Sequence, residues 1–371
     1  MTKQAHYLTE YLPKILIVGV QAPYNLTPNI ESYFQEFRNL VKTNDIIPDY
    51  ELYIQLRSID PSYFFTKGKL EELKEYCDEY YIEEVVISDT LSALQERNLS
   101  DMLDCRVYDR TQLILEIFEK GAHSAEGKAQ VAIAMFQHLK TRMAGKGINY
   151  AQQSGVRGFR GGFGETAKEK EKRHLEKSIL NLERQLEHLH KVRATQRKQR
   201  LNTGIKQICI IGYTNAGKST ILNALTKSNV LAENKLFATL DTTTRELYIH
   251  GTKVGLISDT VGFIQQLPTK LIDAFKSTLS ELEYADLLLH VVDISDPNWE
   301  AHIQVVHEIL RELGVEKDML YVFNKVDLLG IVPHHGSAIN RYQPHIIINA
   351  TSKEGIKPLV EYLQDWQAYQ Q

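Results

Sequence analysis

The chain has 371 residues, of which 43% are hydrophobic and 24% charged, an ordinary composition for a globular protein. This length predicts two or three domains. No apolar run approaches the roughly 20 residues that span a bilayer, and the N-terminus lacks the basic start and apolar stretch of a secretory signal. The three cysteines have no metal-ligand or disulfide-framework spacing, so we expect buried thiols in a reducing compartment.

The net charge of −4 conceals a strong segregation along the chain. Between residues 140 and 200, sixteen Lys and Arg stand against six Asp and Glu, a local charge of +10 that leaves −14 on the remainder. Such an imbalance favours a polyanionic partner for this part of the protein.

Residues 1–109 alternate short apolar runs with helix-like stretches, for which 29–43 and 68–81 are examples. This alternation predicts an N-terminal parallel α/β domain without a Gly-rich phosphate fingerprint after its first strand. The runs that we expect to be buried strands are 14–20, 51–56, 84–88 and 105–109.

Residues 110–203 have the pattern of a basic helical hairpin. We expect one long helical stretch over 110–143 and a second helix over 166–200. The first has a stripe of Val131, Met135 and Leu139, spaced four apart. The second has a coiled-coil seam of Leu175, Ile179, Leu182, Leu186 and Leu189. The two helices are expected to pack antiparallel.

A glycine-rich tip loop, 144–164, joins these expected helices. Residues 145–165 contain seven glycines and the basic residues Lys146, Arg157 and Arg160, with no acid before Glu165. Glycines and arginines can lie against a phosphate backbone, where contacts give affinity without sequence specificity. The alternative interpretation is a solvated hairpin whose charges only face water.

Residues 204–371 predict a doubly wound α/β domain, because six strand candidates are separated by helix-length segments. These candidates are KQICIIGY, ELYIHG, KVGLISD, DLLLHVVDIS, MLYVFNKVD and HIIINAT.

The first strand of this region leads into GYTNAGKS (212–219), which matches the P-loop pattern G-x-x-x-x-G-K-[ST]. Backbone N–H groups of such a loop surround phosphate oxygens, assisted by the dipole of the following helix. Lys218 would reach the β- and γ-phosphates and Ser219 would bind Mg²⁺. The expected phosphate-binding residues are Gly212, Tyr213, Thr214, Asn215, Ala216, Gly217, Lys218 and Ser219.

The tetrapeptide NKVD predicts that the nucleotide is GTP or GDP. The carboxylate of Asp327 can accept hydrogen bonds from guanine N1–H and N2–H₂, which adenine lacks. We expect Asn324 at the base edge and Lys325 along the base plane, with Val326 between Lys325 and Asp327. An isolated tetrapeptide of this kind would be an ordinary surface segment, but here it follows a P-loop and a DxxG in the expected order.

Three further segments complete the expected site. DTVG (Asp259, Thr260, Val261 and Gly262) would place Asp259 at Mg²⁺ through water and the Gly262 amide at the γ-phosphate.

FATLD (Phe237, Ala238, Thr239, Leu240 and Asp241) is the expected switch segment. Thr239 is our choice for the side-chain Mg²⁺ ligand, with Thr242, Thr243 and Thr244 as competitors. NAT (Asn349, Ala350 and Thr351) would give a backbone contact to guanine O6, or be an ordinary loop. The expected metal ligands are therefore Ser219, Thr239 and Asp259, and the expected catalytic residues are Lys218, Thr239 and Gly262.

Phe263 occupies the position where many signalling GTPases have the glutamine that orients the attacking water. A hydrophobic side chain can neither orient nor polarise water, so hydrolysis should be slow until a partner completes the site.

Together with these motifs, several segments make the chain resemble the HflX family of translational GTPases. They are YFFTKGKLEELKEY (63–76), LSALQERNLSDMLDCRVYDRTQLILEIF (91–118), SAEGKAQVAIAMFQHL (124–139), GVRGFRGGFGET (155–166), LFATLDTTTRE (236–246) and DTVGFIQQLP (259–268). The resemblance implies a cytoplasmic GTPase, ribosome- or membrane-peripheral and monomeric. It implies binding to the large ribosomal subunit and its rRNA through the basic hairpin, with the glycine loop near the peptidyl-transferase region. In its GTP state such a protein splits or rescues stalled ribosomes, and it leaves after hydrolysis. The alternative is a GTP-gated dormancy or assembly factor.

The sequence also departs from the family pattern. Thr242 stands where the family commonly has proline, Asn349 where serine is usual, and AKEKEKRH follows GET where QLETDRR is frequent. Many members carry a further C-terminal domain after the last helix, so we expect some contacts to ribosomal proteins to be absent.

Overall fold

The computed structural model describes residues 13–25, 27, 29–145, 167–202, 204–226, 235–240, 242–266, 279–329 and 336–369. It divides into two compact units, which are described one at a time. Unit 1 comprises Met1–Leu26, Asn44–Leu113 and Thr141–Gly158; unit 2 comprises Thr27–Thr43, Ile114–Lys140 and Phe159–Gln371. The three-part division at residues 109 and 203 remains a prediction.

Unit 1 is built on a four-stranded parallel sheet in the order β2-β1-β3-β4, and all four predicted strands are confirmed. The strands are β1 (Ile15–Gln21), β2 (Tyr50–Gln55), β3 (Glu84–Ile87) and β4 (Arg106–Tyr108). Alternate residues of β1, Leu16, Val18 and Val20, enter one apolar cluster because successive side chains of a strand point to opposite faces. Helices α2 (Lys67–Tyr80) and α3 (Ala93–Leu103) supply Leu73 and Leu99 to that cluster.

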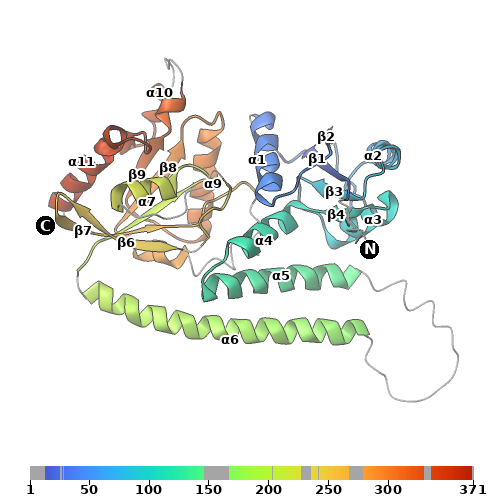
Figure 1. Cartoon of the computed structure of the whole chain (residues 1–371), viewed down its shortest axis with the longest axis horizontal. Helices are drawn as coiled ribbons and strands as arrows, with labels where there is room; N and C mark the ends of the chain where they lie inside the picture. Colours follow the sequence, from blue (N-terminus) through green and yellow to red (C-terminus); the bar gives the residue numbers. More distant parts are fainter. Residues whose placement is uncertain are drawn as a thin grey trace, which may run out of the picture. The chain divides into compact units, whose positions relative to one another are not determined.

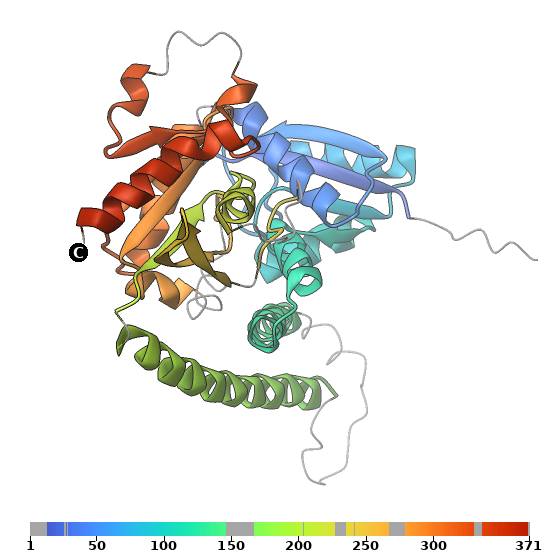
Figure 2. The ribbon, with the colours of Figure 1, turned by 60° about the vertical axis from the view of Figure 1, so that its left-hand side comes forward.

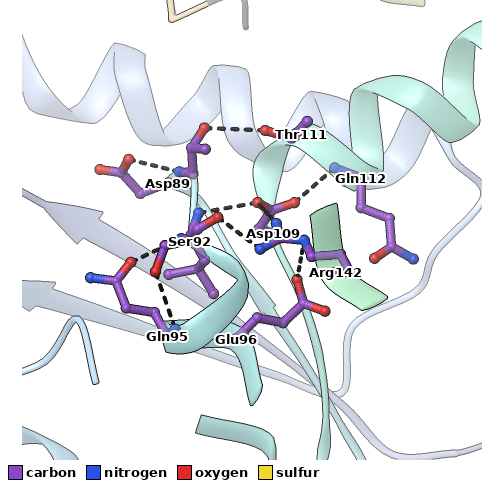
Figure 3. A network of polar contacts seen from close by, with 10 residues as sticks. Asp89, Ser92, Gln95, Glu96, Asp109, Thr111, Gln112 and Arg142 are labelled. Atoms are coloured by element: carbon purple, nitrogen blue, oxygen red, sulfur yellow. Dashed lines mark hydrogen bonds and ion pairs between the residues drawn. The ribbon is translucent and has the colours of Figure 1, made fainter. Parts of the chain in front are cut away.

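A buried polar network lies beyond the carboxyl ends of β3 and β4 (Figure 3). Asp109, fully buried, accepts hydrogen bonds from the Leu91 N–H (3.1 Å) and the Gln112 N–H (2.8 Å). Its third partner is Arg142, whose Nη2 lies 2.7 Å from Asp109 Oδ2 and whose Nε lies 2.8 Å from Glu96 Oε2. The Arg142 clasp, as we call these contacts with Asp109 and Glu96, therefore holds the segment that leads into the tip loop.

Unit 2 contains a six-stranded sheet in the order β10-β9-β8-β5-β7-β6, so the six predicted strands are confirmed. The strands are β5 (Gln207–Gly212), β6 (Thr243–Ile249), β7 (Thr252–Asp259), β8 (Leu287–Asp293), β9 (Met319–Asn324) and β10 (His345–Ile347). All pairings are parallel except the β6–β7 hairpin.

Both faces of this sheet are covered, as a doubly wound fold requires (Figure 1). Ile208 and Ile210 of β5 pack with α7 (Lys218–Thr226) and α11 (Lys353–Tyr369). The intervening Cys209 and Ile211 face the opposite cluster, which contains residues of α9 (Trp299–Glu312). The remaining short elements are η1 (Ser280–Tyr284), η2 (Val326–Leu328) and α10 (Gly336–Ile339).

The predicted single helical stretch over 110–143 is wrong. The structure has α4 (Arg110–Gly121) and α5 (Ala125–Gly145), separated at residues 122–124. The break has a local cause, because Ser124 Oγ accepts the Gly127 N–H at 2.9 Å and so caps α5.

Helix α1 (Ile30–Thr43) also belongs to unit 2.

Helix α6 (Ala167–Asn202) is one continuous element, as predicted for 166–200 (Figures 1 and 2). It runs antiparallel to α5, because Lys140 Nζ lies 2.8 Å from Glu176 Oε1 and Glu126 Oε1 lies 3.5 Å from His190 Nε2. The later residue of α5 thus pairs with the earlier residue of α6.

The predicted seam of α6 is the less exposed side of that helix. Leu175 and Ile179 are buried, and Leu182, Leu186 and Leu189 are half-buried. The α5 stripe is confirmed in part, since Val131 is buried and Met135 half-buried, whereas Leu139 is 49% exposed. Residues 146–164 of the tip loop lie outside the described residues. Within the described part of the chain, no helix is both long and apolar enough to cross a bilayer.

Candidate nucleotide-binding site

The P-loop, the switch segment and DTVG meet in a cleft of about 420 Å³ that is open to solvent. The P-loop follows β5, the strand at which the sheet order reverses: the chain next adds β6 and β7 on one side of it and β8 on the other. Ligands of open α/β sheets bind outside the carboxyl ends of strands at such a point. The cleft is lined by Thr214, Asn215, Gly217, Lys218, Ser219, Thr220, Lys235, Phe237, Ala238, Thr239 and Gly262.

The shape of the P-loop depends on Gly217. Its φ of +97° is one that side chains rarely adopt, and a Cβ there would lie 2.3 Å from Asn324 Nδ2. Lys218 follows as the first residue of α7 and is only 6% exposed. The sequence-predicted loop thus places a lysine at the start of a helix whose dipole favours anions.

Lys218 is a cation held away from water. Its Nζ donates to Tyr213 O at 2.7 Å. Burial lowers the pKa of Lys218 to about 8, and the neighbouring Asp259 carboxylate opposes that shift. A buried ammonium beside the helix N-terminus provides the charge that a phosphate needs.

The three predicted metal ligands lie together. Ser219 Oγ is 2.6 Å from Asp259 Oδ2 and 2.7 Å from Thr239 Oγ1. Asp259 is fully buried, and its Oδ1 has no hydrogen-bond partner among the described residues. Burial raises the pKa of Asp259, whereas Lys218 lowers it. Hydroxyl and carboxylate oxygens are the ligands that Mg²⁺ prefers, so this set fits the ion.

Among the competitors for the switch ligand, the structure favours Thr239. Thr243 and Thr244 belong to β6, where Thr244 Oγ1 pairs with Ser258 Oγ at 2.8 Å. Asp241 lies outside the described residues. Phe237 and Leu240 are buried in the same cluster as Phe118 of α4, whose ring meets that of Phe237 edge-on. Among the described residues of this switch segment, Thr239 is therefore the one whose side chain reaches Ser219.

DTVG and Phe263 are tied to the P-loop through the backbone. The Thr214 N–H donates to Phe263 O (2.7 Å), and the Phe263 N–H donates to Gly212 O (3.2 Å). A Cβ on Gly262 would lie 2.9 Å from Lys218 Nζ, so a glycine is needed at this contact. The Phe263 side chain is 1% exposed and packs in the core. It therefore points away from the cleft.

Asn324 of NKVD connects two other motifs through its side-chain amide, and its contact with the base edge stays a prediction. Its Nδ2 donates to Ala216 O (2.9 Å) and its Oδ1 accepts the Ala350 N–H (3.1 Å). A guanine O6 would share or take over that amide. The neighbouring Asn349 Oδ1 accepts the N–H and hydroxyl of Thr351, so NAT forms a closed turn.

The other two polar residues of NKVD differ in their surroundings. Asp327 is exposed to solvent. Lys325 has φ +66°, and its Nζ lies 2.6 Å from Asp293 Oδ2. The sequence motifs did not indicate Asp293, which ends β8 directly opposite Asn324 of β9. The available signal was an acid at the carboxyl end of the strand that precedes NKVD.

Tyr213 has contacts that its place in the P-loop did not predict. Its hydroxyl donates to Glu36 of α1 and accepts the Gln265 N–H at 2.7 Å. Its ring stacks on His302, with centroids 3.7 Å apart and planes 7° apart. This residue therefore connects the P-loop with α1, α9 and the segment after DTVG.

Three features together define a P-loop GTPase. They are a P-loop after the first strand of a doubly wound sheet, a set of oxygen ligands beside that loop, and NKVD at the end of β9. Three family models match in succession: "GTP-binding GTPase N-terminal" at residues 31–119, "GTP-binding GTPase Middle Region" at 121–200 and "50S ribosome-binding GTPase" at 207–325.

Curated relatives named GTPase HflX extend this match. The Caldanaerobacter subterraneus protein is 44% identical over 83% of this chain and 71% of its own length. The Lacrimispora saccharolytica protein is 41% identical over 96% and 84%. The chain belongs to the HflX family of GTPases, which hydrolyse GTP to GDP. A crystal structure of SsGBP with GDP shares the fold, with a TM-score of 0.51 and 23% identity over 96% of this chain and 99% of that one.

Proposed function

We propose that this GTPase binds the large ribosomal subunit in its GTP state and separates the subunits of stalled ribosomes. One observation supports the proposal most strongly. The same chain contains a nucleotide-binding cleft and an antiparallel helical hairpin of high positive charge. Within 140–200 the charge is +10, and rRNA is the polyanion that a protein of this family would meet. Because ribosomes work in the cytoplasm, the protein would act there as well.

In the proposed reaction, water attacks the γ-phosphate, and this chain's residues hold and neutralise the phosphates. Lys218 neutralises the β- and γ-oxygens, and the Gly262 amide donates to the γ-phosphate. Ser219, Thr239 and, through water, Asp259 would hold Mg²⁺, which supplies positive charge to the phosphates when bound. Asp327 selects guanine, while Lys325 is held by Asp293 beside the base position.

The residue directly after DTVG is Phe263 instead of a glutamine, and its side chain lies in the core, where it cannot orient water. The proposed consequence is that the ribosome supplies or positions the missing group. Hydrolysis would then follow subunit binding and would release the protein. An assembly or dormancy factor in which GTP only gates binding has the same site and differs only in the outcome for the ribosome.

The experiment mixes 70S ribosomes with the full chain and a non-hydrolysable GTP analogue, then separates subunits by sedimentation. We expect 30S and 50S peaks to grow at the expense of 70S, with the protein in the 50S fraction. GDP is the matched control. Binding without separation would favour the gated factor, and no binding would reject the ribosome as partner.

A charge-reversed variant tests whether the hairpin is the contact. Arg157→Glu with Arg160→Glu should weaken sedimentation with 50S subunits and flatten its salt dependence, since fewer counterions are released. A fluorescent GTP titration should be unchanged, because the nucleotide motifs lie at 212–351. Wild-type ribosome affinity in this variant would assign the contact to another surface.

A further inference from the structure

Two of the three cysteines, distant in the sequence, meet in unit 1. Cys77 lies in the last turn of α2, and Cys105 directly precedes β4. Both side chains belong to the same buried apolar cluster. Both residues also contact Ile82, whose N–H donates to Cys77 O (3.0 Å) and whose carbonyl oxygen lies 3.0 Å from Cys105 Sγ.

The fold brings the two thiols together through two helix ends. The residues that directly follow α2 and α3, Tyr81 and Asp104, are both in the left-handed conformation with φ 55°. This conformation turns the chain sharply at a helix C-terminus. The first turn brings Ile82 back against Cys77, and the second directs Cys105 toward the same point. The pair is thus fixed by backbone geometry rather than by flexible loops.

The surroundings favour reaction at Cys105 over the other two thiols. The hydrogen bond from Cys77 lowers the pKa of Cys105 and raises that of Cys77, and Lys74 further lowers the Cys105 pKa. Lys74 Nζ lies 3.3 Å from Leu103 O and 2.6 Å from Asp78 Oδ1. Cys209 of unit 2 differs, because burial raises its pKa to about 12.

The two thiols are buried, but an exposed residue lies beside them. Cys77 is 2% exposed and Cys105 7% exposed, whereas Asp78 beside them has a side chain that is 61% exposed. Cys105 is the more exposed of the two residues at 7%, so its oxidant must be small.

We propose that Cys77 and Cys105 are a reversible dithiol–disulfide pair whose oxidant is a small hydroperoxide such as hydrogen peroxide. The Cys105 sulfur attacks one peroxide oxygen, the O–O bond breaks, and one water leaves with formation of a sulfenic acid. The Cys77 sulfur then attacks the Cys105 sulfur, and the second water leaves. Two thiols and one H₂O₂ thus give one disulfide and two waters. A low-molecular-weight thiol reverses the reaction by exchange.

The test uses the full chain, reduced and then exposed to a small excess of hydrogen peroxide. The protein is then denatured, alkylated with iodoacetamide and digested with trypsin. Cleavage after Lys74, Arg97 and Arg106 puts the two cysteines in separate peptides, 75–97 and 98–106. We expect alkylated thiols to fall from three to one, with the two peptides disulfide-linked and Cys209 still alkylated. Dithiothreitol should restore all three.

Matched variants make the result decisive. Cys209→Ser should form the linked peptides like the wild type, whereas Cys77→Ser and Cys105→Ser should not. In Cys77→Ser, dimedone should label Cys105 as a sulfenic acid. Circular dichroism checks folding, and Cys→Ala replaces any serine variant that unfolds. The proposal is wrong if all three wild-type thiols stay alkylatable under oxidation that fully consumes free glutathione. It is equally wrong if Cys209 enters the disulfide as often as its partners.

Discussion

At the scale of single residues, the nucleotide motifs depend on one another. Asn324 contacts the P-loop through Ala216 and the NAT turn through Ala350, so one buried amide aligns three sequence motifs. Asp293 likewise holds Lys325. The proposed guanine site is therefore preorganised by bonds within the protein, and we propose that the exposed Asp327 contacts the base.

Asp327→Asn tests the base contact. The amide can donate to a xanthine 2-oxo group but cannot accept both guanine donors, so we expect GTP affinity to fall about tenfold or more and XTP affinity to rise. Competition binding with GTP, XTP and ATP measures this change. Asp365→Asn, at an exposed position of α11, is the control and should bind like the wild type. An unaltered preference for GTP in Asp327→Asn would remove this residue from the site.

His290 makes the stability of unit 2 sensitive to acid. This side chain of β8 is 1% exposed, its Nδ1 has no partner among the described residues, and burial lowers its pKa from 6.5 to about 3. The unfolded chain takes up this proton at a higher pH than the folded chain does. The contribution of neutral His290 to the free energy of unfolding is therefore fully present above pH 6.5 and falls as the pH drops toward 3. Near pH 5 the loss is about 2 kcal/mol.

His290→Phe should therefore flatten the pH dependence of unfolding between about pH 7 and 5. Chemical denaturation at several pH values measures this slope. The exposed His174→Gln of α6 should retain the wild-type slope. Equal slopes for the wild type and His290→Phe would show that other groups control acid stability.

At the scale of helices and strands, periodicity predicted most of the fold. Apolar runs located the ten strands found among the described residues, because a buried strand is rich in apolar side chains. The break between α4 and α5 was missed, since the apolar spacing continues through it and Ser124 gives only a local capping signal. The placement of α1 against Tyr213 is a tertiary contact that no local pattern contains.

The site was predictable to a similar extent and for a similar reason. Motifs with fixed spacing predicted that Ser219 and Asp259 lie together, and their oxygens are 2.6 Å apart; their role as Mg²⁺ ligands stays a prediction. The buried position of Phe263, the bracing role of Asn324 and the meeting of Cys77 with Cys105 depend on how separate strands and helices pack. Sequence order does not show such contacts.

The Arg142 clasp is the element-scale contact that we expect to matter most for unit 1. Asp109 is fully buried and the Arg142 side chain is 11% exposed. Arg142→Met should cost about 3 kcal/mol, because it leaves a buried carboxylate without its cation. Lys140→Met, which removes a solvent-exposed ion pair with Glu176, should change stability little. Urea unfolding compares the two, and equal effects would contradict the assigned role of Asp109.

At the scale of the whole molecule, charge and catalysis are separated along the chain. The segment 140–200 has the positive charge, whereas residues 212–351 contain every nucleotide motif. The core position of Phe263 leaves attacking water without an orienting side chain at the usual place. We propose that the ribosome completes the catalytic site of this GTPase.

The most direct measurement of that claim is the GTP turnover of the full chain with and without purified large ribosomal subunits. We predict slow turnover alone and a rise of at least about tenfold with subunits. The Arg157→Glu, Arg160→Glu variant should need more subunits for the same stimulation. Rapid turnover by the isolated chain that large subunits leave unchanged would contradict the account, because another residue of the chain would then orient the water.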